Sequence, residues 1–191
     1  QIEHLAIRSS ANGLKILLTH CKQLKSLHLF QGSEPMHILK DSSIKSALKG
    51  IRFEGLRALS LYQQFVIPSN LHELFPSLTT LCLSHCTHID QETISKNAPL
   101  LQQIEQLVLC DTDLQDEDFL EMIRCCLDLR SLVLLVCQNT QVKTILQALW
   151  SSGGRIKDCF FLGDKASMDR CLQSKEYSSL STRLVVRASH S

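Results

Sequence analysis

The chain has 191 residues, of which 44% are hydrophobic and only 5% aromatic, with seven glycines and four prolines. This composition excludes a disordered chain and argues against an all-β sandwich, in which glycine and proline mark frequent turns. The net charge is only +1, and the length fits one domain that spans residues 1–191. No apolar run approaches the roughly 18 residues of a membrane span, because the densest run, 132–137, has six residues.

The charges are unevenly distributed along the chain. Residues 1–57 hold nine basic and four acidic residues (net +5), residues 58–130 three and eleven (net −8), and residues 131–191 eight and four (net +4). A nucleic-acid-binding protein is expected to have a more consistently basic surface, so we do not expect a nucleic-acid partner. The acidic middle has two interpretations, solvated helix faces or a field that attracts a basic protein.

The nine cysteines are an odd number without the paired spacings of a secreted disulfide scaffold. No Asn-x-Ser/Thr glycosylation sequence occurs. Both observations favour a reducing compartment, so the sequence predicts a cytoplasmic or nuclear protein with free thiols and no membrane association. Because the first residue is Gln1, we expect a preceding segment in the natural protein.

From the N-terminus onwards, the pattern apolar-x-x-apolar-x-apolar recurs seven times. Its last two apolar residues are two positions apart, which places both on one face of a β-strand. The starting positions are 22, 32, 22, 26, 25 and 27 residues apart. We therefore expect a short strand with one buried face in each of the segments 2–7, 24–29, 56–61, 78–83, 104–109, 129–134 and 156–161.

Between the predicted strands, the apolar residues change to the i, i+3, i+4, i+7 spacing of one helix face. This spacing occurs in the segments 14–21, 44–51 and 142–149. A strand–helix unit of about 25 residues buries its apolar face only by stacking on its neighbours. The prediction is a curved α/β solenoid with strands on the concave face and helices on the convex face. The expected helix N-caps are Asp90, Asp116, Thr140 and Asp164.

The segment 78–137 resembles the cysteine-containing leucine-rich repeat, in which Leu-x-x-Leu-x-Leu-x-x-Cys precedes a turn with isoleucine and aspartate and a helix that ends in cysteine. Cys86, Ile89 and Asp90 match this form, as do Cys126 and Cys137. The general repeat covers nearly the whole chain. The resemblance implies a ribonuclease-inhibitor-like solenoid of seven to eight repeats with parallel strands, in which residues 164–191 form a closing unit.

Such repeats are typical of the substrate-recognition half of F-box proteins. The resemblance therefore implies protein recognition without catalysis, as the substrate-binding region of an F-box-type ubiquitin-ligase receptor. The F-box itself, which would dock the cullin adaptor, is not among these 191 residues. A leucine-rich-repeat scaffold or inhibitor unrelated to ubiquitination is the main alternative.

The sequence LCLSHCTHID at 81–90 contains the thiol and imidazole ligands that zinc prefers. In the predicted strand, Cys82 points to the concave surface, whereas Cys86 lies in the turn and packs inward. Zinc needs ligands that converge at about 2.0–2.3 Å, so we predict no metal site here and no cofactor. The acidic run at 111–118 lacks the glycine and the ligand spacing of a calcium-binding EF-hand loop.

Ser33, His37 and Asp41 fall close together in the segment 31–43 and suit a nucleophile, a base and an orienting group. No Gly-x-Ser-x-Gly elbow occurs in the chain. We therefore favour a polar insertion loop, and a hydrolase with its chemistry on 31–43 is a remote alternative.

The strand residues that point away from the predicted core form the concave face. Its first half is polar with two aromatic residues, and its second half is apolar. An exposed apolar patch usually marks a binding surface, and aromatic anchors are typical of binding hot spots. The alternative is that the tail 177–191 covers the patch, or that a last strand at 183–187 closes the sheet edge. The expected partner-binding residues are Phe30, Tyr62, Val108, Val133, Leu135, Phe160 and Leu162.

Overall fold

The computed structural model describes residues 2–8, 19–30, 52–63, 71–87, 89–135, 140–163 and 184–188. The strands in these ranges are β1 (His4–Arg8), β2 (Ser26–Phe30), β3 (Ala58–Tyr62), β4 (Thr80–Ser84), β5 (Gln106–Cys110), β6 (Ser131–Leu135), β7 (Asp158–Gly163) and β8 (Leu184–Ala188). The helices are α3 (Leu71–Leu74), α4 (Gln91–Lys96), α5 (Ala98–Gln102), α6 (Asp116–Cys125) and α7 (Val142–Ser151).

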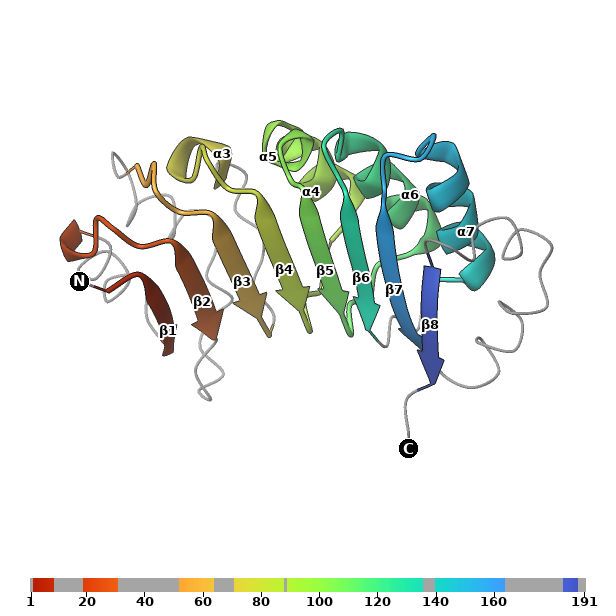
Figure 1. The fold of residues 1–191 in the computed structure, drawn as a ribbon, viewed down its shortest axis with the longest axis horizontal. Helices are drawn as coiled ribbons and strands as arrows, with labels where there is room; N and C mark the ends of the chain where they lie inside the picture. The colour runs from red at the N-terminus through yellow and green to blue at the C-terminus, as the bar shows by residue number, and fades with distance from the viewer. Residues whose placement is uncertain are drawn as a thin grey trace.

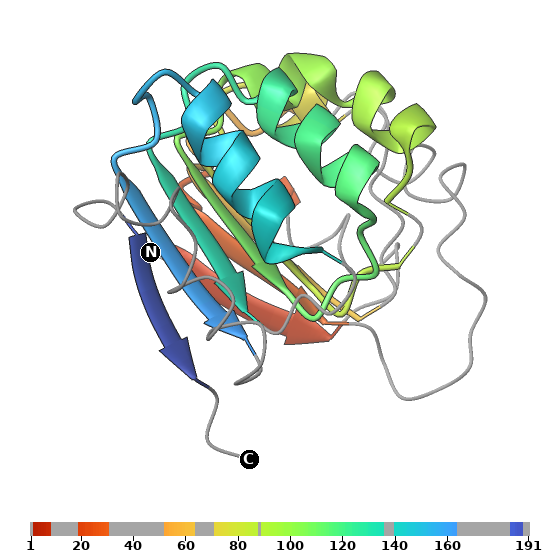
Figure 2. The same ribbon diagram turned by 90° about the vertical axis from the view of Figure 1, so that its right-hand side faces the viewer.

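The eight strands form one parallel sheet in chain order, β1 to β8 (Figure 1). Each strand pairs with the next without a shift in register, so that corresponding residues of the repeats lie side by side. The helices form a second layer on one face of this sheet, as Figure 2 shows. The predicted α/β solenoid of leucine-rich repeats is therefore confirmed.

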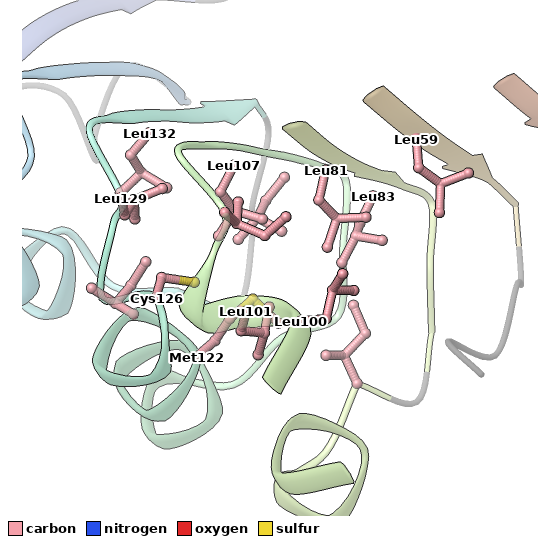
Figure 3. Packing of buried hydrophobic residues seen from close by; sticks show 14 of the residues in the cluster. Leu59, Leu81, Leu83, Leu100, Leu101, Leu107, Met122, Cys126, Leu129 and Leu132 are labelled. Atoms are coloured by element: carbon pink, nitrogen blue, oxygen red, sulfur yellow. The ribbon is translucent and has the colours of Figure 1, made fainter. Parts of the chain in front are cut away.

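Leucine occupies the second and fourth positions of β2 to β6, and period-two alternation turns both towards the helices. In β2 to β7 the residues at these positions are between 0% and 7% exposed. They belong to one buried cluster that also contains Leu100, Leu101 and Met122 of the helix layer (Figure 3). The core is thus a series of parallel leucine rows between the sheet and the helices. The strand leucines labelled in Figure 3 are Leu59, Leu81, Leu83, Leu107 and Leu132.

The predicted apolar stripe of the segment 142–149 is confirmed in α7, because Ile145, Leu146 and Leu149 are buried. Most of the other two predicted helices, 14–21 and 44–51, lies outside the described residues. No helix in the described ranges combines the length and the apolar character that a membrane span requires.

The predicted N-cap Asp90 is confirmed. Its carboxylate accepts a hydrogen bond from the Thr93 backbone N–H at 2.8 Å, and this bond and the Thr93 hydroxyl lower the pKa of Asp90. Hydrogen bonding to the ionised form satisfies one of the free N–H groups in the first turn of α4.

The predicted N-caps Asp116 and Thr140 are wrong, because α6 and α7 begin after Gln115 and Gln141 respectively. Both side chains bind a neighbouring repeat instead. The Asp116 carboxylate accepts a hydrogen bond from the Gln141 backbone N–H at 2.7 Å, and the Thr140 hydroxyl donates to the Leu114 carbonyl at 3.1 Å. These polar residues connect consecutive repeats. The fourth predicted N-cap, Asp164, lies outside the described residues.

The last strand of the sheet is β8. It begins and ends one residue later than the predicted strand at 183–187. It pairs in parallel with β7, with Leu184 opposite Cys159, so this segment extends the sheet edge. The rest of the predicted closing unit, 164–183 and 189–191, lies outside the described residues, and so does any cover that it provides. At the end of β7, a Cβ atom on Gly163 would lie 2.5 Å from Cζ of Phe161, so any other residue there would have to displace the Phe161 ring.

Candidate partner-binding face

The first, third and fifth residues of β1 to β7 point away from the helices, and we call the surface that they form the sheet face. It corresponds to the predicted concave face. The strand register aligns its residues in rows across the sheet. The middle row of third residues is Ala6, His28, Ser60, Cys82, Val108, Val133 and Phe160. The outer row of fifth residues is Arg8, Phe30, Tyr62, Ser84, Cys110, Leu135 and Leu162.

Five of the predicted partner-binding residues lie together on β5 to β7. Val133 stands opposite both Val108 and Phe160 in the middle row, and Leu135 stands opposite Leu162 in the outer row. All five side chains are half-buried. We call these five residues the apolar group.

The other two predicted residues, Phe30 and Tyr62, form a separate aromatic pair on β2 and β3. Their rings are stacked with centroids 4.4 Å apart and an interplanar angle of 11°. Burial, followed by the proximity of the Cys82 thiol, raises the pKa of the Tyr62 phenol. The phenol therefore stays protonated near neutral pH and offers a hydrogen-bond donor beside a flat apolar surface.

Small polar residues separate the aromatic pair from the apolar group. They include Ser60 and Ser84, which are 6% and 5% exposed although they belong to the sheet face. Burial raises the pKa of the Cys82 thiol, and the nearby Cys110 thiol raises it further. A protonated thiol is a weak nucleophile. Cys82 therefore suits contact with a partner better than nucleophilic catalysis.

The two cysteines of the segment 81–90 lie on opposite sides of the sheet. Cys82 is on the sheet face, whereas Cys86 is fully buried and its thiol donates to the Leu61 carbonyl at 3.5 Å. His85 is paired instead with Asp111, with 2.8 Å between Nδ1 and Oδ2. Within the described part of the chain, no three histidine, cysteine or acidic residues are grouped so that they could hold a metal ion.

The turns that follow β3, β4 and β5 share an unusual backbone conformation. Gln63, His85 and Asp111 have φ angles of 60°, 52° and 47°, the left-handed region that non-glycine residues seldom adopt. Each donates its backbone N–H to the last carbonyl of the following strand at 2.8 Å. The same hydrogen bond therefore joins the turn of each of three consecutive repeats to the end of the next strand. This bond holds the strand ends, which carry the outer row, in register. No signal in the sequence marked these three positions.

Four residues of the acidic middle, Asp90, Asp113, Glu117 and Asp118, lie in the segments that follow β4 and β5. The pKa of Asp118 is raised by burial and then by the carboxylates of Asp90, Glu117 and Asp113. Repulsion of this kind indicates that these three carboxylates lie near that of Asp118. The field beside β4 and β5 is therefore negative.

Arg8 and His28 were not among the predicted binding residues, which were chosen for apolar and aromatic character alone. Arg8 is exposed and stands opposite Phe30 in the outer row. His28 is half-buried in the middle row, and its Nε2 lies 3.2 Å from the Ser26 hydroxyl. Their positions in the repeat pattern were the signal that could have identified them. The candidate hydrolytic residues Ser33, His37 and Asp41 lie outside the described residues.

A family model described as "FBD-associated F-box protein At5g56370, LRR repeats" matches residues 45–189. No curated protein matches the chain. The matched range contains β3 to β8 and the whole apolar group, and it covers well over half of the chain. Leucine-rich-repeat solenoids present extended surfaces to other proteins. The chain belongs to this family of leucine-rich repeats, which is related to the substrate-binding regions of F-box proteins and suggests a role in protein interaction.

Proposed function

We propose that the chain recognises another protein through the sheet face, as the substrate-binding region of an F-box-type ubiquitin-ligase receptor. In this proposal residues 1–191 act as a single leucine-rich-repeat domain of a cytoplasmic or nuclear protein. An F-box, which these residues do not contain, docks the cullin adaptor. The observation that carries the proposal is the apolar group on β5 to β7, in a chain of an F-box-related repeat family.

The apolar group spans three neighbouring strands. Neighbouring strands are about 4.8 Å apart, so the group extends about 10 Å across the sheet. Its side chains are half-buried, which leaves apolar area that a partner can remove from water at about 25 cal/mol per Å². We therefore propose that the partner inserts apolar side chains here. Phe160 is its central anchor, because aromatic residues are enriched among hot spots.

The test uses a charged substitution on the face and a matched one on the helix layer. Phe160→Asp is expected to weaken binding of the captured partner about 30-fold or more, which corresponds to about 2 kcal/mol. Trp150→Asp is the control, because Trp150 lies on α7 and is 66% exposed. Partners are captured from lysate with the full gene product and identified, and the affinity of each variant is then measured by calorimetry.

The ubiquitin part of the proposal needs a second measurement. The full gene product is expected to co-purify with the cullin adaptor, and deleting the gene should raise the cellular level of the captured partner. Binding without the adaptor and without any change in partner level would instead identify a scaffold or an inhibitor. Equal losses of affinity for Phe160→Asp and Trp150→Asp would exclude the sheet face as the binding surface.

A further inference from the structure

We infer that the segment recognised by the sheet face is bipartite, with an acidic residue at one end and apolar residues at the other. It lies across the strands, with the acidic residue beside Arg8 and Phe30 and the apolar residues on the apolar group. The inference rests on the proposed function, because it names the chemistry of the partner that the same face would bind.

The N-terminal end of the sheet face combines a cation with an aromatic surface. The exposed Arg8 stands opposite Phe30, whose ring is stacked on Tyr62. None of the ion pairs among the described residues involves Arg8; those in the neighbouring repeats join Lys25 to Glu3 and Arg52 to Glu54. His28 lies in the adjoining middle row of the face, and His4 lies in the row of first residues.

This arrangement suits a carboxylate. The guanidinium group of arginine presents parallel N–H donors that match the two oxygens of a carboxylate. Phe30, opposite Arg8, offers an apolar surface against which the side chain of the acidic residue can pack. A histidine in the neighbouring row adds a further donor. An aspartate or glutamate of the partner would therefore be held at this end.

Negative charge in the middle of the chain disfavours an acidic residue of the partner beside β4 and β5. Residues 58–130 carry a net charge of −8, and the carboxylates of Asp90, Asp113, Glu117 and Asp118 lie in the segments that follow β4 and β5. At the far end, Asp158 is exposed on β7, and Arg187 of β8 stands opposite Leu162 in register. Repulsion from the acidic groups favours the β1 end over the middle of the face for an acidic residue of the partner.

The fold also sets the separation of the two parts of the partner. Arg8 lies on β1, whereas Leu135 and Leu162 lie on β6 and β7 in the same row. At about 4.8 Å per strand these positions are about 24 Å and 29 Å from Arg8. An extended peptide advances about 3.3 Å per residue. The acidic residue is therefore expected about seven to nine positions away from the apolar residues.

The test is a selection from random peptides of about 15 residues, displayed on phage and panned against the 191-residue chain. The wild type should enrich peptides with an acidic residue about seven to nine positions from two apolar residues. Arg8→Glu should enrich lysine or arginine at the acidic position and retain the apolar residues. It should also weaken the best wild-type peptide about tenfold or more. Arg124→Glu, the same change of charge on α6, is the control and should leave the selection unchanged.

Two further outcomes separate this inference from the proposed function. If the apolar preference appears and is lost in Phe160→Asp, but Arg8→Glu selects the same peptides as the wild type, the bipartite partner is refuted and the binding face stands. If no peptides are enriched, or if Phe160→Asp leaves the selection unchanged, the proposed function fails and this inference fails with it.

Discussion

The leucine rows between sheet and helices predict a large stability loss for Leu132→Ala. Leu132 is 0% exposed, and its neighbours in register, Leu107 and Cys159, are 0% and 2% exposed. Removing its branched side chain leaves a cavity that β6 cannot close, because hydrogen bonds to β5 and β7 hold the strand on both sides. The expected cost is about 3 to 5 kcal/mol, a large part of the roughly 5 to 15 kcal/mol that stabilises a typical domain.

The matched control is the next residue, Val133, which is half-buried on the sheet face. Val133→Ala should cost less than about 1.5 kcal/mol, because it leaves no enclosed cavity. Urea titration followed by far-ultraviolet circular dichroism gives both values. Since each repeat contacts only its neighbours, a lower m-value for Leu132→Ala would indicate that the last repeats unfold separately. Equal losses for the two variants would refute the assignment of the leucine rows as the core.

Two other positions give independent predictions. Burial raises the pKa of the Cys126 thiol from 9.0 to about 12; the unfolded chain therefore loses this proton first, and stability should fall as the pH rises from about 9 towards 12. In Cys126→Ala the urea midpoint should fall less between neutral and alkaline pH than it does in the wild type. An equal fall in the two proteins would contradict the burial of the Cys126 thiol. Gly163→Ala should cost about 1 to 3 kcal/mol through its clash with the buried Phe161 ring. Thermal unfolding should show a smaller cost in a Phe161→Leu background, whereas an equal cost would rule out the clash.

The strands were predictable because one simple rule decides them. Apolar residues at every second position have only one way to be buried in a sheet, and the seven segments found this way overlap β1 to β7. The strand predicted separately at 183–187 is β8, displaced by one residue. Helix starts were harder to predict. Asp116 and Thr140 have the side chains of N-caps, but their hydrogen bonds go to the next and the previous repeat, and such tertiary contacts leave no local pattern in the sequence.

The sequence predicts which residues belong to the candidate binding face, but not which of their side chains contact one another. The repeat pattern identifies which strand residues share a face, yet the stacking of Phe30 on Tyr62 depends on the unshifted register of β2 and β3. The pairing of His85 with Asp111 depends on two left-handed turns in neighbouring repeats. Arg8 was not chosen as a binding residue because the choice rested on apolar and aromatic character. Its position opposite Phe30 becomes visible only in the paired strands.

The constant register of the strands has a consequence for how such a protein can diversify. Equivalent strand residues are 22 to 32 positions apart in the sequence, yet they stay aligned across the sheet. Insertions between strands are absorbed away from the rows, so they leave adjacent surface residues adjacent. Gene duplication can lengthen the array by one strand, and a point mutation can exchange one surface residue without disturbing the others. A lineage of such proteins can therefore acquire new targets through single substitutions while its scaffold is conserved.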